Sequence, residues 1–449
     1  MNYYSTNKKA PSVSLREAVL NGLAQDGGLY MPERISQMPS DFFVRLPSLS
    51  FQEIAYEVGR VLFAGDLPDS TLDEICRESF DFPVPLKRVD ASTHALELFH
   101  GPTLAFKDFA ARFMARLMGY YVRHDDRELT ILVATSGDTG SAAAHGFLNV
   151  PGIRVFILYP SGRVSDLQEK QLTTMGGNIT ALEVQGSFDD CQALAKQAFV
   201  DPDLKKKMRM GSANSINIAR LFPQTFYYWW AVEQMGKRGQ AQILHSQKLS
   251  QTPTEPDPII VSVPSGNVGN LTAGLIAKQM GLPIGRFIAA CNENNVIPEY
   301  LKTGIFTPKP SRATISNAMD VGNPSNFVRM QELYGHSADA MRHDLSAHSF
   351  TDDQTRAAMR DVYNDTGYIL DPHGAVGYCA LKEYQKQYPE TYGIILETAH
   401  PAKFKDVVED TIGSPVDIPK RLAEYMMREK QAVLLPARFG ALKEFLISS

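Results

Sequence analysis

Lys107 lies in surroundings that suit the chemistry of an amine nucleophile. Apolar residues recur every four positions after it, which predicts a helix that begins near Lys107; they are Phe109, Phe113, Leu117 and Tyr121. A cation in the first turn opposes the helix dipole, and the flanking residues Phe106 and Phe109 would lower its pKa by desolvation. Schiff-base chemistry requires the neutral amine. The alternative is a solvated lysine paired with Asp108.

Two glycine turns each stand between an apolar run and a helical pattern. The first is PSGNVGN, residues 264–270, where successive N–H groups could converge on a phosphate at a helix N-terminus. The second is TSGDTG, residues 135–140, whose hydroxyl and backbone donors could bind a carboxylate or a phosphate. A plain strand–helix turn at the first site, and N-capping by Ser136 or Asp138 at the second, need no ligand.

Thr398 follows a third apolar run, in ETAHPAKF, and could place a hydroxyl in the same cleft. Taken alone, Thr398 is better interpreted as a threonine at the strand edge that faces its own backbone. His373 and His400 suit structural roles, and no histidine has a spacing to another that indicates a metal site.

The elements that position these residues form an α/β pattern. From about residue 99, continuous apolar runs alternate with helical segments, which indicates two mainly parallel sheets flanked by helices. We predict a small, mainly helical N-terminal domain at 1–85 and a catalytic region of two α/β lobes at 86–449, the smaller lobe at roughly 100–220. His245–Pro258 has the composition of a surface connection, and Thr303–Asn326 that of a lid, a binding loop or a solvent-exposed excursion.

Composition excludes several classes of protein. The net charge is −5 without a basic tract, so nucleic acid is not an expected partner. No apolar run is long enough to span a membrane, and the four dispersed cysteines suit a reducing, cytoplasmic setting. The usual signatures of dinucleotide dehydrogenases, P-loop enzymes, zinc proteases and α/β-hydrolases are missing. We expect no metal, and a monomer or a weak homodimer.

Taken together, the motifs resemble those of threonine synthases that carry an extra N-terminal domain, within the pyridoxal-phosphate enzymes of the tryptophan-synthase β-subunit fold (fold type II). The resemblance rests on the order and spacing of GPTLAFKDFA, TSGDTG, PSGNVGN and ETAHPAKF. The segments Gly22–Ala24, Asp26–Tyr30, Ala213–Gln224 and Ser316–Asn326 also match. The likeness extends from the first residues to beyond Phe404.

The resemblance implies a role for each motif. Lys107 would carry pyridoxal 5′-phosphate covalently and move protons, and Thr398 would face the pyridine nitrogen. The cofactor phosphate would lie on the backbone N–H groups of the first turn, namely Gly266, Asn267, Val268, Gly269 and Asn270. The substrate carboxylate would lie on the second turn, namely Ser136, Gly137, Asp138 and Thr139. Asp138 stands where related enzymes often carry asparagine.

The implied reaction converts O-phospho-L-homoserine and water into L-threonine and phosphate. The departing phosphate needs a second cationic site, for which we select Asn214, Asn217 and Arg220, because an arginine fork suits phosphate. Packing and capping at the start of the following helix is the alternative for these three. Lys170, Arg312 and Lys403 are further candidate cations. A phospho-lyase or dehydratase of the same fold, or a metabolite-binding protein without activity, are the rival functions.

Overall fold

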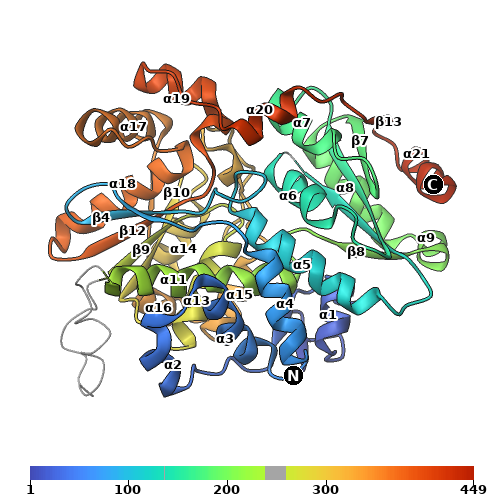
Figure 1. The fold of residues 1–449 in the computed structure, drawn as a ribbon, viewed down its shortest axis with the longest axis horizontal. Helices are drawn as coiled ribbons and strands as arrows, with labels where there is room; N and C mark the ends of the chain where they lie inside the picture. Colours follow the sequence, from blue (N-terminus) through green and yellow to red (C-terminus); the bar gives the residue numbers. More distant parts are fainter. Residues whose placement is uncertain (136, 238–258) are drawn as a thin grey trace. The chain divides into compact units, whose positions relative to one another are not determined.

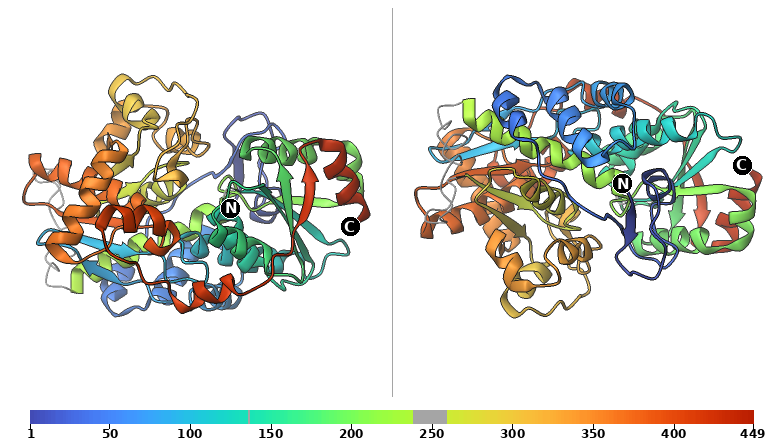
Figure 2. Two further views of the ribbon diagram at one scale, coloured as in Figure 1. Left: turned by 90° about the horizontal axis from the view of Figure 1, so that it is seen from above. Right: turned by 90° about the horizontal axis from the view of Figure 1, so that it is seen from below.

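The computed structural model describes residues 1–135, 137–237 and 259–449. Unit 1 comprises Met1–Met31, Gly101–Arg220 and Ile418–Ser449, and unit 2 comprises Pro32–His100 and Leu221–Asp417. Each unit contains one large sheet (Figures 1 and 2). The domain boundary at residue 85 stays a prediction, and the connection His245–Pro258 lies outside the described residues. Within the described part of the chain, no helix is long and apolar enough to cross a membrane.

The sheet of unit 1 has five parallel strands in the order β13-β7-β6-β5-β8. Their bounds are β5 Leu129–Ala134, β6 Ile153–Pro160, β7 Ile179–Gln185, β8 Arg209–Ser212 and β13 Val433–Pro436. The helices are α5 Lys107–Val122, α6 Asp138–Phe147, α7 Asp166–Thr173, α8 Phe188–Val200, α9 Pro202–Lys207, α20 Lys420–Met426 and α21 Phe439–Ser448. Strands β5 and β6 are almost wholly buried, as their continuous apolar runs predict.

The first 31 residues of unit 1 pack beside this sheet. Helix α1 (Leu15–Asn21) begins at a capping box formed by Ser14 and Glu17, and it contacts β8. Strands β1 (Tyr3–Ser5) and β2 (Tyr30–Pro32) form a two-stranded sheet that the sequence pattern did not predict. Each has only three residues, too few to show a period-2 alternation.

The sheet of unit 2 has six strands in the order β11-β10-β9-β12-β4-β3, parallel except for the edge pair β3–β4. Their bounds are β3 Leu86–Arg88, β4 Thr93–Glu97, β9 Ile259–Pro264, β10 Arg286–Cys291, β11 Leu345–Ser349 and β12 Tyr392–Glu397. Two mainly parallel sheets flanked by helices were predicted, and this architecture is confirmed.

The helices of unit 2 include those that hold its glycine turn. Helix α18 packs on β9, β10 and β12, while α13 packs on β10, α11 and α15. The bounds are α2 Ser40–Arg45, α3 Phe51–Phe63, α4 Asp69–Ser79, α11 Phe226–Met235, α13 Gly269–Gln279, α14 Val296–Thr303, α15 Phe327–Leu333, α16 Ala338–Asp344, α17 Asp352–Thr366, α18 Pro372–Gln387 and α19 Lys405–Ile412. The short helix α10 (Ile218–Leu221) lies where the chain passes from unit 1 to unit 2.

Candidate active site

Lys107 is the first residue of α5, as predicted, and is half-buried. The loop before it is held by Asp108, whose fully buried carboxylate accepts hydrogen bonds from the Thr103 N–H (2.8 Å) and Oγ1 (2.7 Å). A Cβ at Gly101 would lie 2.5 Å from Asp108 Oδ2, so the loop closes only on glycine at that position. These bonds fix the backbone immediately before the lysine.

The turn 135–140 joins β5 to α6 and is closed by its own side chains. Thr135 Oγ1 accepts hydrogen bonds from the N–H groups of Gly137 (3.0 Å) and Gly140 (2.9 Å). Gly137 has φ +152°, which strains any other residue, and a Cβ there would lie 2.6 Å from Gln168 Nε2. Gly137 is the N-cap of α6, and Asp138 lies in the first turn of the helix, where its carboxylate accepts from Gln168 Nε2 (3.0 Å). Ser136 lies outside the described residues, and Thr139 is half-buried.

Helix α7 supplies two buried side chains that the sequence analysis did not select. Gln168 bonds Asp138 in the turn, and Gln171 Nε2 donates to the Thr103 carbonyl (3.2 Å) in the loop before Lys107. One helix therefore braces both candidate segments of unit 1. No local pattern could have selected these glutamines, because their partners are about 30 and 68 residues away. Lys170, on the same helix, donates to the Arg428 carbonyl (2.6 Å).

The three residues selected for the leaving phosphate have different surroundings. Asn217 is fully buried; its Nδ2 donates to the Val19 and Ser212 carbonyls and its Oδ1 accepts from the Ala219 N–H. Arg220 is 3% exposed and donates to the Ala213 carbonyl (2.6 Å), and burial lowers its pKa to about 10. These contacts favour the packing-and-capping alternative for Asn217. The Oδ1 of Asn214 is buried and has no hydrogen-bond partner among the described residues, but an amide oxygen only accepts hydrogen bonds and so cannot bind a phosphate dianion.

In unit 2, the turn 264–270 joins β9 to α13, and its backbone donors point to an anion site. The first intrahelical bond of α13 runs from the Thr272 N–H to the Val268 carbonyl. None of the described residues accepts a hydrogen bond from the N–H groups of Gly266, Val268, Gly269 or Asn270. Val268 has φ +50°, a strained conformation for a β-branched residue. Such a helix start, with free donors and a positive dipole end, is suited to a phosphate.

Two side chains stabilise this turn without using those donors. Asn270 Nδ2 donates to the Pro264 carbonyl (2.9 Å), which closes the turn across its base. Asn267 Oδ1 accepts from the Ser325 N–H (2.5 Å), which binds the turn to the segment 303–326. Asn270 and Asn267 thus hold the shape of the turn through their side chains and leave the backbone donors available.

The segment 303–326, predicted as a lid, binding loop or exposed excursion, packs directly on the turn. A Cβ at Gly266 would lie 2.8 Å from Met319 Cα and 2.9 Å from the Ala318 carbonyl oxygen, so only glycine permits this contact. The Ala318 N–H donates to His373 Nε2 (3.2 Å), and His373 Nδ1 is 2.6 Å from Asp371 Oδ1. His373 therefore has the structural role expected for it. Residues 316–326 are a packed part of the site, whereas residues 303–313 are mostly exposed, as predicted for a solvent-exposed excursion.

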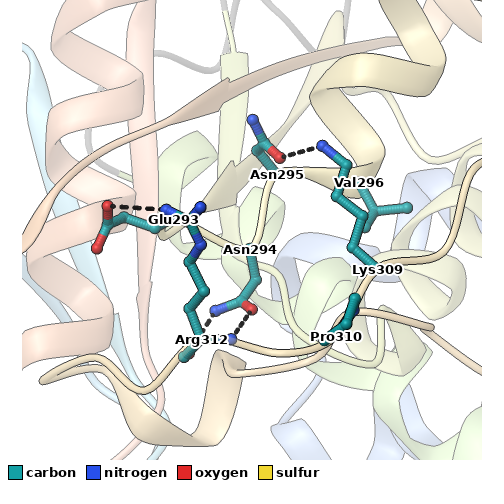
Figure 3. Close-up of a pocket in the computed structure, with 8 residues that line it drawn as sticks. Glu293, Asn294, Asn295, Val296, Lys309, Pro310 and Arg312 are labelled. Carbon is teal, nitrogen blue, oxygen red and sulfur yellow. Dashed lines mark hydrogen bonds and ion pairs between the residues drawn. The ribbon is translucent and has the colours of Figure 1, made fainter.

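A cavity of about 140 Å³ lies between this segment and the start of α14 (Figure 3). Arg312 and Lys309 line it from the segment, and Glu293, Asn294 and Asn295 line it from the other side. Both cations have an acidic neighbour, because Lys309 pairs with Glu299 and Arg312 Nη1 lies 3.9 Å from Glu293. With its charges already balanced, this cavity is a weaker candidate for a phosphate than the start of α13.

Thr398 is buried directly after β12, and none of the described residues forms a hydrogen bond with its hydroxyl. The preceding Glu397 is fully buried, and burial together with the nearby charge of Asp371 raises the pKa of its carboxyl well above the ordinary value. His400 Nδ1 accepts from the Ala402 N–H (3.1 Å), and burial lowers the pKa of His400 to about 4. Lys403 is a buried cation in the same segment.

Three family models together match nearly the whole chain. A model described as pyridoxal-phosphate dependent enzyme matches residues 85–396, and models of the threonine synthase N terminus and C-terminal region match 2–80 and 374–446. The threonine synthase of Haemophilus influenzae is 43% identical, with all of both chains covered.

The chain belongs to the threonine synthase family.

Solved structures of the family agree with this assignment. The threonine synthase of Escherichia coli is 42% identical, with a TM-score of 0.88 and full coverage of both chains. The threonine synthase of Brucella melitensis, solved with bound pyridoxal phosphate, is 35% identical with a TM-score of 0.90, covering 100% of this chain and 99% of that one. As a threonine synthase of a pyridoxal-phosphate dependent family, the protein uses this cofactor.

The described residues fit that cofactor in two respects. The unpaired N–H groups at the start of α13 are the donors that a phosphate monoester requires, and the glycines at 266 and 269 keep side chains away from them. The Thr398 hydroxyl, without a protein partner, can meet a pyridine nitrogen. Which residues bind cofactor and substrate stays a prediction, developed below.

Proposed function

We propose that the protein converts O-phospho-L-homoserine and water into L-threonine and inorganic phosphate. The single observation that carries the proposal is the set of unpaired N–H groups at the start of α13, in a chain that matches threonine synthases along its whole length. When bound, pyridoxal phosphate supplies an electron-accepting ring that stabilises negative charge at the reacting carbons of the substrate.

Binding of the cofactor is divided among three segments in this proposal. Lys107 Nζ attaches it covalently, and the N–H groups of residues 266–270 bind its phosphate. Thr398 Oγ1 faces the ring nitrogen, where a neutral hydroxyl does not hold a proton on the ring as a carboxylate would. The absence of a described partner for this hydroxyl supports the role.

The proton transfers are assigned to Lys107. Its amine removes the proton from the substrate α-carbon and returns a proton there at the end of the reaction. Phosphate leaves from the γ-carbon and water adds at the β-carbon. The hydrogen bonds that Asp108 makes to Thr103 hold the start of α5, so that Nζ is presented from a fixed backbone.

The substrate carboxylate is assigned to the turn of residues 136–139, which includes Ser136, Gly137, Asp138 and Thr139. Because Thr135 already accepts from two N–H groups of this turn, the contribution of the turn comes from its remaining donors and hydroxyls. For the leaving phosphate, Asn214 and Arg220 stay candidates, and Asn217 acts by shaping the loop that carries them.

The deciding experiment incubates purified protein and pyridoxal phosphate with O-phospho-L-homoserine and measures phosphate and threonine together. Equal amounts of both products are expected. Phosphate accompanied by a keto acid would contradict the proposal and assign a phospho-lyase, because elimination would then occur without addition of water. No phosphate release would contradict it altogether.

We also infer a cytoplasmic protein that is monomeric or weakly dimeric. All four cysteines are free, and burial raises the pKa of Cys191 and Cys291 to about 12, so these thiols are poor nucleophiles that suit a reducing compartment. Sedimentation velocity over a hundredfold concentration range tests the assembly, and a concentration-independent dimer or larger oligomer would contradict it.

A further inference from the structure

Asn326 presents a buried donor that the fold does not use. It is the last residue of the segment 303–326, its side chain is 0% exposed, and it precedes α15. Its Oδ1 accepts a hydrogen bond from Arg329 Nη1 (2.8 Å). A guanidinium can only donate, so the amide oxygen must face Arg329 and the nitrogen must face away. No described residue accepts a hydrogen bond from that Nδ2.

The unpaired nitrogen lies against the start of α13. A Cβ built on Gly269 would lie 3.3 Å from Asn326 Nδ2 and 3.8 Å from its Cγ. The neighbouring Ser325 N–H donates to Asn267 Oδ1, so the chain around Asn326 is attached to the same turn. Two independent features therefore meet at one place: backbone N–H groups without an acceptor, and a fully buried side-chain donor without an acceptor.

Arg329 strengthens this arrangement. It is fully buried, and burial lowers its pKa to about 9, so it is still charged at neutral pH. A cation on the oxygen side of an amide polarises the group and makes its N–H a stronger donor. Its field also favours a dianion beyond the amide, because interactions of buried charges are weakly screened.

We propose that Asn326 Nδ2 is a further ligand of the cofactor phosphate, and that Arg329 is a positioning residue that keeps the amide in its donating orientation. The inference rests on the proposed function, because it takes the anion at the start of α13 to be the phosphate of pyridoxal phosphate. The phosphate of the substrate is the other source of the same chemistry, and the experiment separates the two.

The experiment titrates cofactor-free protein with pyridoxal phosphate and, separately, with pyridoxal, which lacks the phosphate. For Asn326→Ala we expect the Kd of pyridoxal phosphate to rise about tenfold or more, which is about 1.4 kcal/mol. The affinity for pyridoxal should change less than twofold. The ³¹P resonance of the bound cofactor should also shift, because one hydrogen bond to the phosphate is lost.

Asn326→Asp keeps the shape and the contact to Arg329 but replaces the donor by a negatively charged acceptor. If the amide binds phosphate, this variant should fold well and bind pyridoxal phosphate even more weakly than Asn326→Ala. Asn364→Asp, at an exposed position on α17, adds the same charge elsewhere and should leave the affinity unchanged. Arg329→Lys, which keeps the charge but loses the fixed fork, should give an intermediate effect.

Three results would overturn the inference. Unchanged affinity for pyridoxal phosphate in both Asn326 variants would leave the amide without a ligand role. Equal losses for pyridoxal phosphate and pyridoxal would make the residue structural. A higher KM for O-phospho-L-homoserine with unchanged cofactor affinity would assign the amide to the substrate phosphate. Failure of the proposed function is separate, since it would appear in the wild-type protein as a lack of threonine production.

Discussion

The two glycine turns have nearly the same sequence pattern and opposite hydrogen-bonding states. In unit 1, Thr135 Oγ1 accepts from two N–H groups of the turn before α6, so the protein itself occupies these donors. In unit 2, the position that corresponds to Thr135 is Pro264, which has no hydroxyl, and the hydroxyl of the following Ser265 donates to the Val263 carbonyl. The N–H groups of Gly266, Val268, Gly269 and Asn270 have no acceptor among the described residues.

The difference shows what a glycine-rich turn does and does not imply. Glycine allows the backbone to turn, but whether the turn binds an anion depends on the fate of its N–H groups. We call the turn of unit 1 closed, because Thr135 accepts hydrogen bonds from two of its N–H groups. It can offer only its remaining hydroxyls and donors to a substrate. We call the turn of unit 2 open, because four of its N–H groups have no acceptor among the described residues. These groups are the donors that a tightly held phosphate needs. We therefore expect a substitution in the turn of unit 1 to lower stability without changing cofactor affinity. A substitution in the turn of unit 2 should weaken the binding of the cofactor.

The largest effect is expected at Lys107, the amine that unit 1 contributes. Lys107→Ala should reduce threonine formation by about 10³-fold or more, because the general base for the α-proton is lost. Circular dichroism should show an unchanged fold, and borohydride should no longer fix the cofactor to the protein. Full activity in this variant would contradict the assignment of Lys107.

The next largest effect is expected in the open turn. Gly266→Ala would place a Cβ 2.8 Å from Met319 Cα and 2.9 Å from a backbone oxygen, so either the turn or the segment 303–326 must move. We expect a loss of about 1–3 kcal/mol in stability and at least a tenfold weaker affinity for pyridoxal phosphate. A matched control is Gly377→Ala on α18 of the same unit, because Gly377 has no positive φ and its added Cβ would lie 3.6 Å or more from its neighbours. Normal cofactor affinity in Gly266→Ala would separate the turn from the phosphate.

Sequence patterns predicted the elements that carry both turns, because each depends on local signals. The helix start at Lys107 and the apolar strands before each turn were found at their positions. Strand β4, THALE, was not predicted. Its five residues are all buried, but Thr93, His94 and Glu97 interrupt the apolar run that marks a central strand.

The open or closed state of a turn could not be predicted in the same way. It depends on contacts between residues far apart in the chain, such as Gln168 with Asp138 and Asn326 with Gly269. Gln168 has no neighbours in sequence that distinguish it from an ordinary surface residue, and the family match of Ser316–Asn326 does not show which donors of Asn326 are free. Their burial and their partners follow from the fold alone.

A moderate effect is expected when the closed turn is opened. Thr135→Val keeps the shape of the side chain but removes the acceptor of two buried N–H groups, which should cost roughly 2 kcal/mol of stability. Cofactor affinity should change less than twofold, in contrast to Gly266→Ala. Thr135→Ser, which restores the acceptor, should recover most of the loss in chemical denaturation. A tenfold loss of cofactor affinity in Thr135→Val would show that the two turns do not divide their roles in this way.

The smallest effect is expected when the pH is lowered. It arises from His400, in the segment of unit 2 that follows Thr398. His400 is neutral in the fold because burial lowers its pKa from 6.5 to about 4, and its Nδ1 accepts from the Ala402 N–H. The unfolded chain binds a proton at higher pH than the folded protein does. The contribution of His400 is therefore complete above pH 6.5 and declines as the pH falls towards 4.

His400→Asn tests this pH dependence, since asparagine can accept the same backbone hydrogen bond without titrating. Its thermal unfolding temperature should fall less steeply than that of the wild-type protein between pH 6.5 and 4, and the two should differ little at pH 8. His100, Glu97, Asp371 and Lys403 also act on the charge of His400, so the comparison is made at constant ionic strength. Parallel curves for the two proteins would mean that His400 does not titrate in this range. The acid sensitivity of unit 2 would then arise from its other groups.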